Sequence, residues 1–474
     1  MNKTLLLLTL ALTTAFVLFK LDYRSFFTDE LAYYYDGREI VNLNDYSKNK
    51  EVPPVGKYLG GISYLIGNRN IFLLRLPFAL LSIFSAFVVY LIIKQSHDEI
   101  WAIIGSAIFS WMPFIFTETR MLMLEAPLIL FWLLFHLFFI KYLQKGGLKY
   151  ACFSGMLLGL SMGTKISSLI LVIFLPVAFT ILKILPNKKL TKSDFRDFII
   201  IGSISTLTYF VLFIPQLIQD GVKSFYLHIK SVYHAYYINR DKGGKLHFIN
   251  GQMYLKSPSW YYFDFINKNY IIPLKIMSLT SPFAVLIQKS FYTYYWVLLF
   301  VISFIFIQMV GVKQVRYITY IELPLIFLIV STLAYINKKS KTAGTVLVLV
   351  LLLSLLATRV VYALNETPTG YNSLYKYMAE RTRNFSTDER FYVYGSIKSS
   401  RWYFFGLKDD LFVSRKEQKD WEALQKDMPT FKYIIFDKIE LAKKPDNSFF
   451  KYITENKLEY NKITLDEFFV YILK

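Results

Sequence analysis

The feature of this sequence that most constrains its fold is a series of apolar blocks long enough to cross a lipid bilayer. In lipid every backbone polar group must be satisfied inside the segment, so blocks of this length form helices. The composition agrees, because 54% of the residues are hydrophobic and only 19% are charged, too little polar surface for a soluble protein of this length. The sequence predicts an all-α polytopic membrane protein of about eleven spans, near residues 4–20, 71–94, 100–117, 122–140, 150–164, 166–185, 198–218, 271–288, 292–310, 317–336 and 343–364.

Two further features narrow the class of protein. The first block runs into Lys20 without a small-x-small cleavage site, so we expect an uncleaved first span rather than a signal peptide. The single cysteine, Cys152, lies inside an apolar block. One cysteine excludes a disulfide framework and a cysteine-based metal site.

The placement of the charge predicts the orientation in the membrane. Much of the net charge of +20 lies in short loops between apolar blocks, which include residues 141–149, 183–196 and 338–341. Because basic loops stay in the cytoplasm, we expect a cytoplasmic N-terminus in the cell membrane and no nucleic-acid partner. Residues 1–364 then form the membrane domain, with extracytoplasmic loops at 21–70 and 219–270.

The last part of the chain, residues 365–474, differs in composition. Its charge is mixed, and short strand-like runs occur at 391–394, 433–436 and 468–472, with a helical pattern at 415–426 between them. This pattern predicts a small soluble α/β domain on the extracytoplasmic side.

The first outer loop offers two groups of candidate residues. Asp29 and Glu30 follow the first span, and one of them is placed to act as a general base for an acceptor hydroxyl. The alternative is that they are solvated acids or the charged start of a helix. Farther on, two prolines and a glycine separate Glu51 from Lys57. These residues form either a rigid corner that presents both charges or simply the entry to the next helix.

Charged residues also occur within or beside the apolar blocks. Glu125 lies in such a block, and an intramembrane carboxylate needs a cation, either Arg120 or another one. Arg75 and Lys165 are placed similarly. Intramembrane charges indicate either a functional site or a structural ion pair between helices, and the sequence leaves both open.

In their order along the chain, these pieces resemble the superfamily of polyprenyl- or dolichyl-phosphate-dependent membrane glycosyltransferases, which have the GT-C fold. The protein O-mannosyltransferases and the lipid A aminoarabinose transferases are the most similar groups. The resemblance covers residues 20–330, and the residues that carry it are Asp29-Glu30, Pro53-Pro54-Val55-Gly56-Lys57, Arg75-Leu76-Pro77, Glu118-x-Arg120 with Glu125, Gly159-Leu160-Ser161-Met162-Gly163-Thr164-Lys165, and Arg316-Tyr317 with Pro324.

The resemblance implies roles for these residues. Asp29 would be the catalytic base with Glu30 in support, and Arg120 would hold the phosphate of the carrier. A guanidinium suits a phosphate because it offers forked donors and keeps its charge beside lipid. The other residues implied in donor or substrate binding are Glu51, Lys57, Arg75, Glu118, Glu125, Lys165 and Arg316.

The sequence departs from the family pattern at two positions. Val52 stands where mannosyltransferases carry a histidine and aminoarabinose transferases a lysine, which puts the acceptor contacts and any metal ligation there in doubt. Glu125 replaces the family's aspartate after Glu-x-Arg, which keeps the charge on a longer side chain.

The second outer loop adds candidates for the acceptor or sugar, namely His247, Trp260 and Tyr261. The aromatic rings either stack on a sugar or lie at the bilayer interface. Glu51 and His247 together make a possible site for a divalent metal ion, since imidazole and carboxylate are both metal ligands.

We therefore expect an enzyme that transfers a sugar from a polyprenyl-phosphate donor to a protein, lipid A or glycan acceptor outside the cytoplasm. Its other partners are membrane lipids and, in a possible dimer, a second copy. One alternative is a transporter or flippase, which predicts inverted repeats or broken helices in matching halves. The other is a non-catalytic assembly protein of envelope polysaccharide synthesis that retains the fold.

Overall fold

The computed structural model describes most of the membrane part and the elements of the tail. The described residues are 2–23, 28–49, 52–184, 191–236, 247–249, 252–254, 257–310, 313–365, 374, 377–378, 380–381, 390–394, 412–414, 431–438, 441, 448–455, 460–465 and 468–473.

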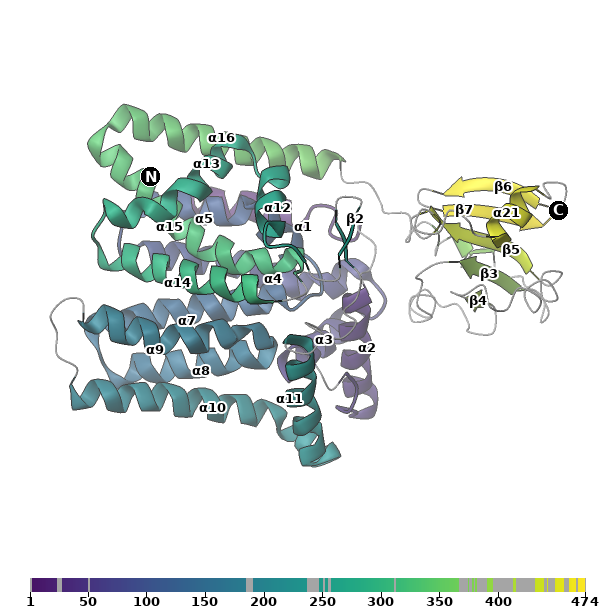
Figure 1. Ribbon diagram of the computed structural model, residues 1–474, viewed down its shortest axis with the longest axis horizontal. Helices are drawn as coiled ribbons and strands as arrows, with labels where there is room; N and C mark the ends of the chain where they lie inside the picture. Colours follow the sequence, from purple (N-terminus) through teal and green to yellow (C-terminus); the bar gives the residue numbers. More distant parts are fainter. Residues whose placement is uncertain are drawn as a thin grey trace. The chain divides into compact units, whose positions relative to one another are not determined.

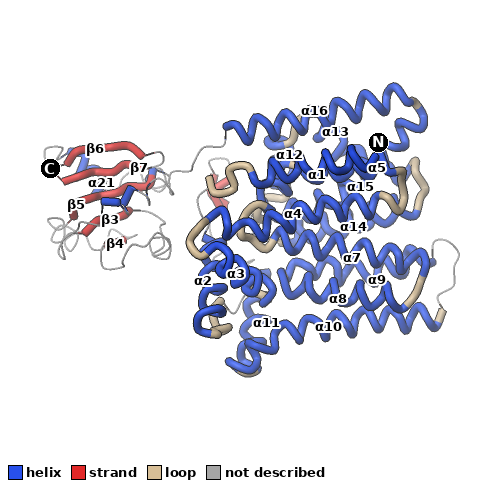
Figure 2. Tube along the Cα trace, turned by 180° about the vertical axis from the view of Figure 1, so that it is seen from behind, coloured by secondary structure: helices blue, strands red, loops and turns tan. Residues whose placement is uncertain are grey.

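Up to residue 365 the described chain is almost entirely helical, and Figures 1 and 2 show its long helices running alongside one another. A small hairpin of β1 (His247–Ile249) and β2 (Gln252–Tyr254) interrupts this pattern. The helices are α1 (Asn2–Leu18), α2 (Thr28–Leu43), α3 (Pro54–Gly67), α4 (Ile71–Ile93), α5 (Glu99–Trp111), α6 (Pro113–Thr119), α7 (Glu125–Lys145), α8 (Leu148–Thr164), η1 (Ile166–Ser168), α9 (Leu169–Ile184), α10 (Lys192–Asp220), α11 (Val222–Tyr236), α12 (Tyr261–Asn269), α13 (Ile272–Thr280), η3 (Ser281–Leu286), α14 (Phe291–Met309), η4 (Val315–Ile318), α15 (Thr319–Lys339) and α16 (Lys341–Asn365).

Helix length and composition define a multi-pass membrane protein. Among the described residues, six helices are long and apolar enough to cross a membrane: α4, α7, α10, α14, α15 with η4, and α16. The pair α5 and α6, bent by 64° at Met112, makes a seventh candidate. The segments 3–18 and 166–182 are apolar but shorter. The predicted count of eleven spans and the orientation in the membrane stay predictions.

Proline explains the two places where an expected span is interrupted. The apolar block 271–288 forms α13 followed by the 3-10 turn η3, and Pro282 lies just after the α-helix ends. Proline donates no backbone hydrogen bond and its ring clashes with the preceding turn, so an α-helix does not continue through it without distortion. Pro113 opens α6 in the same way after α5 ends at Trp111.

The chain divides into two compact units. The first comprises residues 1–19, 33–68 and 73–364, and the second comprises residues 20–32, 69–72 and 365–474. At one end of the first unit, helices α2, α3 and α11 lie beyond the ends of the long helices (Figure 1).

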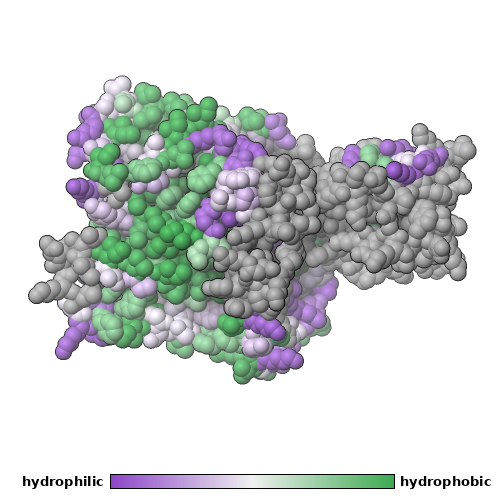
Figure 3. Space-filling view, in the orientation of Figure 1, coloured by the Kyte–Doolittle hydropathy of each residue, from purple (hydrophilic) through white to green (hydrophobic). Residues whose placement is uncertain are grey.

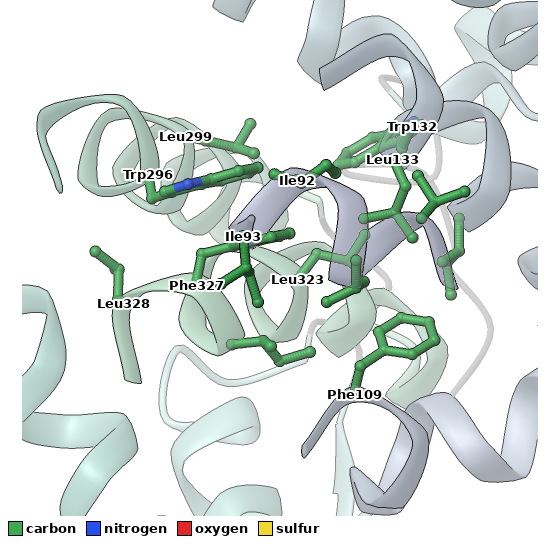
Figure 4. Close-up of a cluster of buried hydrophobic side chains, with 14 of the residues drawn as sticks. Ile92, Ile93, Phe109, Trp132, Leu133, Trp296, Leu299, Leu323, Phe327 and Leu328 are labelled. Carbon is green, nitrogen blue, oxygen red and sulfur yellow. The ribbon is translucent and has the colours of Figure 1, made fainter. Parts of the chain in front are cut away.

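Aromatic and branched aliphatic side chains fill the core of the first unit. Figure 4 shows a part of this core where α4, α7, α14 and α15 meet. The indole of Trp296 stacks on the ring of Phe327, with centroids 3.7 Å apart and planes tilted by 5°. The face seen in Figure 3 has large apolar areas on its surface as well, and α10 exposes Leu207, Phe210, Val211, Ile214 and Ile218. An apolar exterior of this kind suits a lipid solvent.

Helix α8 packs against α10 through glycines spaced four residues apart. A Cβ atom built at Gly155 would lie 2.7 Å from the carbonyl oxygen of Ile201, and one at Gly159 would lie 2.5 Å from that of Ser205. Small residues at this spacing let two membrane helices approach closely. The Gly159–Gly163 motif therefore has a packing role, and it fixes the helix that leads to Lys165.

The described residues of the second unit include a mixed five-stranded sheet. Its strand order is β4-β3-β5-β7-β6, with β3 parallel to β4 and β5, and β7 antiparallel to β5 and β6. The strand-like runs of the sequence lie within β3, β5 and β7, whereas the expected helix at 415–426 lies outside the described residues. The elements are β3 (Arg390–Tyr394), β4 (Phe412–Ser414), β5 (Phe431–Asp437), α21 (Ser448–Glu455), β6 (Tyr460–Leu465) and β7 (Phe468–Leu473).

Candidate functional site

The two-proline corner of the sequence forms the start of α3 and is buried. Pro53 precedes the helix and Pro54 is its first residue, a position where the missing N–H costs nothing. A Cβ atom at Gly56 would lie 2.2 Å from the side chain of Leu124, the residue before α7. A Cβ atom at Gly163 would lie 3.2 Å from the side chain of Val55. These contacts bring the starts of α3 and α7 together with the end of α8.

A break between two helices places Lys165 at this meeting point. Helix α8 ends at Thr164, Lys165 has extended backbone angles, and η1 begins at the next residue. The hydroxyl groups of Ser161 and Ser168, on either side of Lys165, lie 2.7 Å apart. Trp132 of α7 donates its indole N–H to Ser168 over 3.3 Å. The break is therefore held in place by buried hydrogen bonds, which orient the lysine.

The lysine forms an ion pair with Glu125. Its Nζ donates a hydrogen bond to Oε1 of Glu125, whose side chain is only 1% exposed, whereas the side chain of Lys165 is 12% exposed. Oε2 of Glu125 has no hydrogen-bond partner among the described residues. Glu125 is also the first residue of α7, where the helix dipole favours a negative charge. The acid is thus enclosed, whereas its cation reaches toward solvent.

A second cation, Arg316, lies within electrostatic range of Glu125. Its Nε donates to Oε1 of Gln314 over 2.5 Å. The neighbouring ring of Tyr317 lies 5.5 Å from Nζ of Lys165, close enough for a cation–π contact. The arrangement therefore has two cations and one buried acid, a net charge of +1, beside an aromatic ring. We refer to Glu125, Lys165 and Arg316 as the cation cluster.

Lys57 has a different environment from the one expected. It lies inside α3, is 1% exposed, and donates through Nζ to the carbonyl oxygen of Lys48 over 2.5 Å. The next residue, Tyr58, donates its hydroxyl to the carbonyl oxygen of Leu212 over 2.6 Å. Burial raises the pKa of Tyr58 to about 12, so this hydroxyl stays a neutral donor. Both contacts hold α3 in place.

Arg120 has contacts that the sequence did not predict. Its Nε donates to the carbonyl oxygen of Val17 over 2.9 Å, and its Nη2 donates to that of Phe19. These carbonyls belong to the end of α1, where the last helical carbonyls have no partner within the helix. Arg120 thus caps α1, and the partner of Glu125 is Lys165 rather than Arg120.

The structure also gives the places of four other residues that the sequence predicts for the site. Asp29 and Glu30 occupy the first turn of α2 in the second unit, and Glu30 is buried. In the first unit, Arg75 is buried in α4 and Glu118 is half-buried in α6. The grouping of Asp29 with the cation cluster stays a prediction.

The acceptor candidates are described in part. Trp260 is 41% exposed just before α12, and Tyr261 begins that helix half-buried. Glu51 lies outside the described residues, as does the side chain of His247 in β1, so the possible metal site stays a prediction. Within the described part of the chain, no group of three or more His, Cys, Asp or Glu side chains could hold a metal ion.

Sequence reasoning missed the polar support around Lys165. Besides Ser161, Ser168 and Trp132, the hydroxyl of Ser167 bonds that of Tyr320 on α15. One signal was available, because three serines and a threonine surround Lys165 within an otherwise apolar run. Polar side chains at such a depth require partners, which indicates a built site.

The chain is similar to one protein-family model and to several solved structures. Residues 51–218 match the family model described as dolichyl-phosphate-mannose-protein mannosyltransferase. The structure of ArnT from Cupriavidus metallidurans bound to undecaprenyl phosphate is similar over 98% of this chain and 97% of that one, with a TM-score of 0.66 at 12% identity. The archaeal oligosaccharyltransferase AglB from Archaeoglobus fulgidus, in complex with an inhibitory peptide and a dolichol-phosphate, is similar over 100% of this chain and 74% of that one, with a TM-score of 0.56 at 13% identity.

No curated protein sequence matches the chain. The match to the family model and the likeness to solved structures support the GT-C glycosyltransferase superfamily. At 12–13% identity the likeness to the solved structures shows the fold alone.

Proposed function

We propose that this chain is a membrane glycosyltransferase that uses a sugar linked to a polyprenyl phosphate and transfers it to an acceptor on the extracytoplasmic side. The cation cluster is the observation that carries the proposal. The leaving group of such a reaction is a lipid phosphate, and cations placed beside its oxygens stabilise the charge that develops there.

Lys165 and Arg316 are the proposed ligands of that phosphate. Lys165 reaches toward solvent from an enclosed acid, and Arg316 lies on η4 beside it. Without donor, Glu125 compensates the charge of Lys165 and keeps its amine in place. An arriving phosphate adds its own negative charge beside the two cations, and Glu125 continues to hold the amine of Lys165 in place.

Asp29 is the proposed general base, with Glu30 in support. The assignment rests on the resemblance of Asp29-Glu30 to the family motif and on their position in the first turn of α2. A carboxylate of this kind takes the proton of the acceptor hydroxyl as that oxygen attacks the anomeric carbon. The bond from the anomeric carbon to the phosphate oxygen breaks, and the polyprenyl phosphate leaves.

We keep Arg120 in the site with a changed role. A guanidinium has five N–H donors, and Arg120 uses Nε and Nη2 for the carbonyls of Val17 and Phe19. This geometry favours Arg120 as the residue that fixes the end of α1, ahead of a role as the first phosphate ligand.

The proposal leaves the sugar and the acceptor at the level of class. A hexose, pentose or aminosugar donor and a protein, lipid A or glycan acceptor all fit the resemblance. Undecaprenyl phosphate in the ArnT structure and dolichol-phosphate in the AglB structure support a polyprenyl-phosphate carrier.

The test is sugar transfer by purified protein in lipid nanodiscs. Labelled polyprenyl-phosphate sugars and a membrane extract of acceptors are supplied to the wild type, to Asp29→Asn and to Asp22→Asn. Asp22 is an exposed acid of the same segment and serves as the matched control. We expect transfer by the wild type and Asp22→Asn and none by Asp29→Asn, which keeps the shape of the side chain and loses its basicity.

Two outcomes contradict parts of the proposal. Normal transfer by Asp29→Asn would exclude Asp29 as the base and leave the enzyme class intact. A folded wild type that binds the carrier and transfers no sugar from any donor would exclude the transferase. Movement of the lipid across proteoliposomes would then support the flippase alternative.

A further inference from the structure

A second buried acid, Glu322, lies away from the cation cluster in the first turn of α15. Its side chain is fully buried, and Oε1 accepts a hydrogen bond from the hydroxyl of Tyr270 over 2.5 Å. Oε2 of Glu322 has no hydrogen-bond partner among the described residues. An acid at this depth either takes up a proton or needs a compensating cation.

The cation within electrostatic range of Glu322 is Arg359 of α16. Arg359 is also buried, and its guanidinium carbon lies 4.9 Å from the ring centroid of Phe116 on α6 and 5.6 Å from that of Tyr362. These distances are within the range of cation–π contacts. Arg359 of α16 therefore contacts α6 through an aromatic ring.

Phe116 is shared by two guanidinium groups. The guanidinium carbon of Arg120 lies 4.9 Å from the centroid of the same ring, the same distance as that of Arg359. Arg120 in turn holds the carbonyls of Val17 and Phe19 at the end of α1. A continuous series of contacts thus runs from Arg359 through Phe116 and Arg120 to α1.

The element at the centre of this series is a short helix. Helix α6 has seven residues, follows a bend of 64°, and ends where Arg120 and the turn before Glu125 begin. A helix of fewer than two full turns depends on tertiary contacts for its position. The contacts of Phe116 are among those that fix where Arg120 lies.

We propose that Glu322 and Arg359 are positioning residues for the reaction, acting through Phe116 on Arg120 and on the turn that leads to Glu125. The inference rests on the proposed function, and it assigns neither residue a contact with substrate. A buried ion pair contributes little net stability compared with apolar residues of the same size. The role of Glu322 and Arg359 in this proposal is to fix the position of α6 beside the site.

Two charged residues that only stabilise the fold are expected to respond to substitution differently from two that position α6. Neutralising both partners together removes the uncompensated charge and restores stability in either case. If the pair only stabilises the fold, turnover returns with stability. If it positions α6, the guanidinium on Phe116 is still missing and turnover stays low.

The experiment compares Arg359→Met, Glu322→Gln and the double variant with the wild type, and uses Thr358→Ala as the matched control. The hydroxyl of Thr358 bonds the carbonyl of Ser354 on its own helix. We expect both single variants to melt at lower temperature and the double variant to recover. We expect kcat/KM of the double variant to stay at least tenfold below that of the wild type. A double variant with turnover within twofold of wild type would overturn the proposal.

Arg359→Lys provides a second test should the other variants fail to fold. It keeps the charge for Glu322 and loses the planar group that lies on Phe116. Hydrogen exchange of the segment 113–124 is read together with turnover, because it reports on α6 without any donor. Exchange at least tenfold faster than in wild type at an unchanged melting temperature supports positioning, and unchanged exchange contradicts it. A wild type that transfers no sugar would contradict the proposed function alone. The hydrogen exchange of residues 113–124 would still decide whether Glu322 and Arg359 position α6.

Discussion

Glu125 and Glu322 are two buried acids, each in the first turn of a membrane helix, and they have opposite kinds of partners. Glu125 pairs with Lys165, whose side chain is 12% exposed and lies at a break between helices. Glu322 accepts a hydrogen bond from the hydroxyl of Tyr270 and lies within electrostatic range of Arg359, and both of these partners are buried. The first acid has a cation that can meet a ligand, and the second has one that cannot.

The difference shows how to distinguish a charged residue that binds a ligand from one that only holds the structure in place. Burial alone does not do so, because both carboxylates are nearly inaccessible. The exposure of the partner cation makes this distinction, since a ligand can approach only a cation that is accessible. By this reasoning we propose the cation cluster as the place of chemistry and the Glu322–Arg359 pair as part of its support.

Removing the exposed partner should have the largest effect. Lys165→Met leaves Glu125 buried without its closest cation, which typically costs about 3–5 kcal/mol of stability. We expect a lower melting temperature and loss of sugar transfer. In the double variant Glu125→Gln/Lys165→Met the melting temperature should recover and transfer should not. Recovery of transfer as well would show that the pair is structural, like that of Glu322.

A substitution that displaces α8 should have an intermediate effect on stability and sugar transfer. It should disturb the surroundings of Glu125 and not those of Glu322. Gly159→Ala places a methyl group 2.5 Å from the carbonyl oxygen of Ser205, and overpacking of this kind costs about 1–3 kcal/mol. We expect reduced stability and a several-fold loss of transfer, because α8 leads to Lys165. The matched control is Gly202→Ala on α10, where a Cβ atom meets nothing within 4 Å. An equal effect of both variants on the thermal unfolding curve would contradict the packing role of Gly159.

Removing the neutral partner of the second acid should have the smallest effect. Tyr270→Phe leaves the buried Oε1 of Glu322 without this donor, and a buried acceptor left without its partner typically costs about 1–3 kcal/mol. We expect a small drop in melting temperature and transfer within about twofold of wild type, since Arg359 still compensates the acid. A loss of transfer as large as that of Lys165→Met would remove the distinction between the two acids.

Much of the site could be predicted from the sequence. The order of the motifs pointed to the superfamily that the comparisons support, and the two-proline corner, Glu125 and Lys165 do meet in space. Motifs of this kind are local, so their residues and spacing are visible in the chain itself. The need of Glu125 for a cation also followed from its depth in an apolar block.

The choice of partners could not be predicted in the same way. Glu125 pairs across 40 residues with Lys165, and Arg120 bonds carbonyls more than 100 residues earlier, at the end of α1. Such contacts depend on which helix ends lie together, which helical periodicity does not encode. The same holds for Glu322 and Arg359, which no motif connects. The break of the expected span at Pro282 shows local chemistry outweighing hydropathy.

The most direct test of the account is whether the cation cluster binds a lipid phosphate. Undecaprenyl phosphate would be titrated into purified wild type, Lys165→Met and Lys145→Met in nanodiscs, with the bound fraction read by native mass spectrometry. Lys145, in the last turn of α7, is the matched lysine at the opposite end of the helix that begins with Glu125. The account predicts binding about 100-fold weaker in Lys165→Met, the size expected when a partner of a buried charge contact is removed. It predicts unchanged binding in Lys145→Met. Equal affinity of Lys165→Met and wild type would contradict the assignment of the phosphate site to the cation cluster.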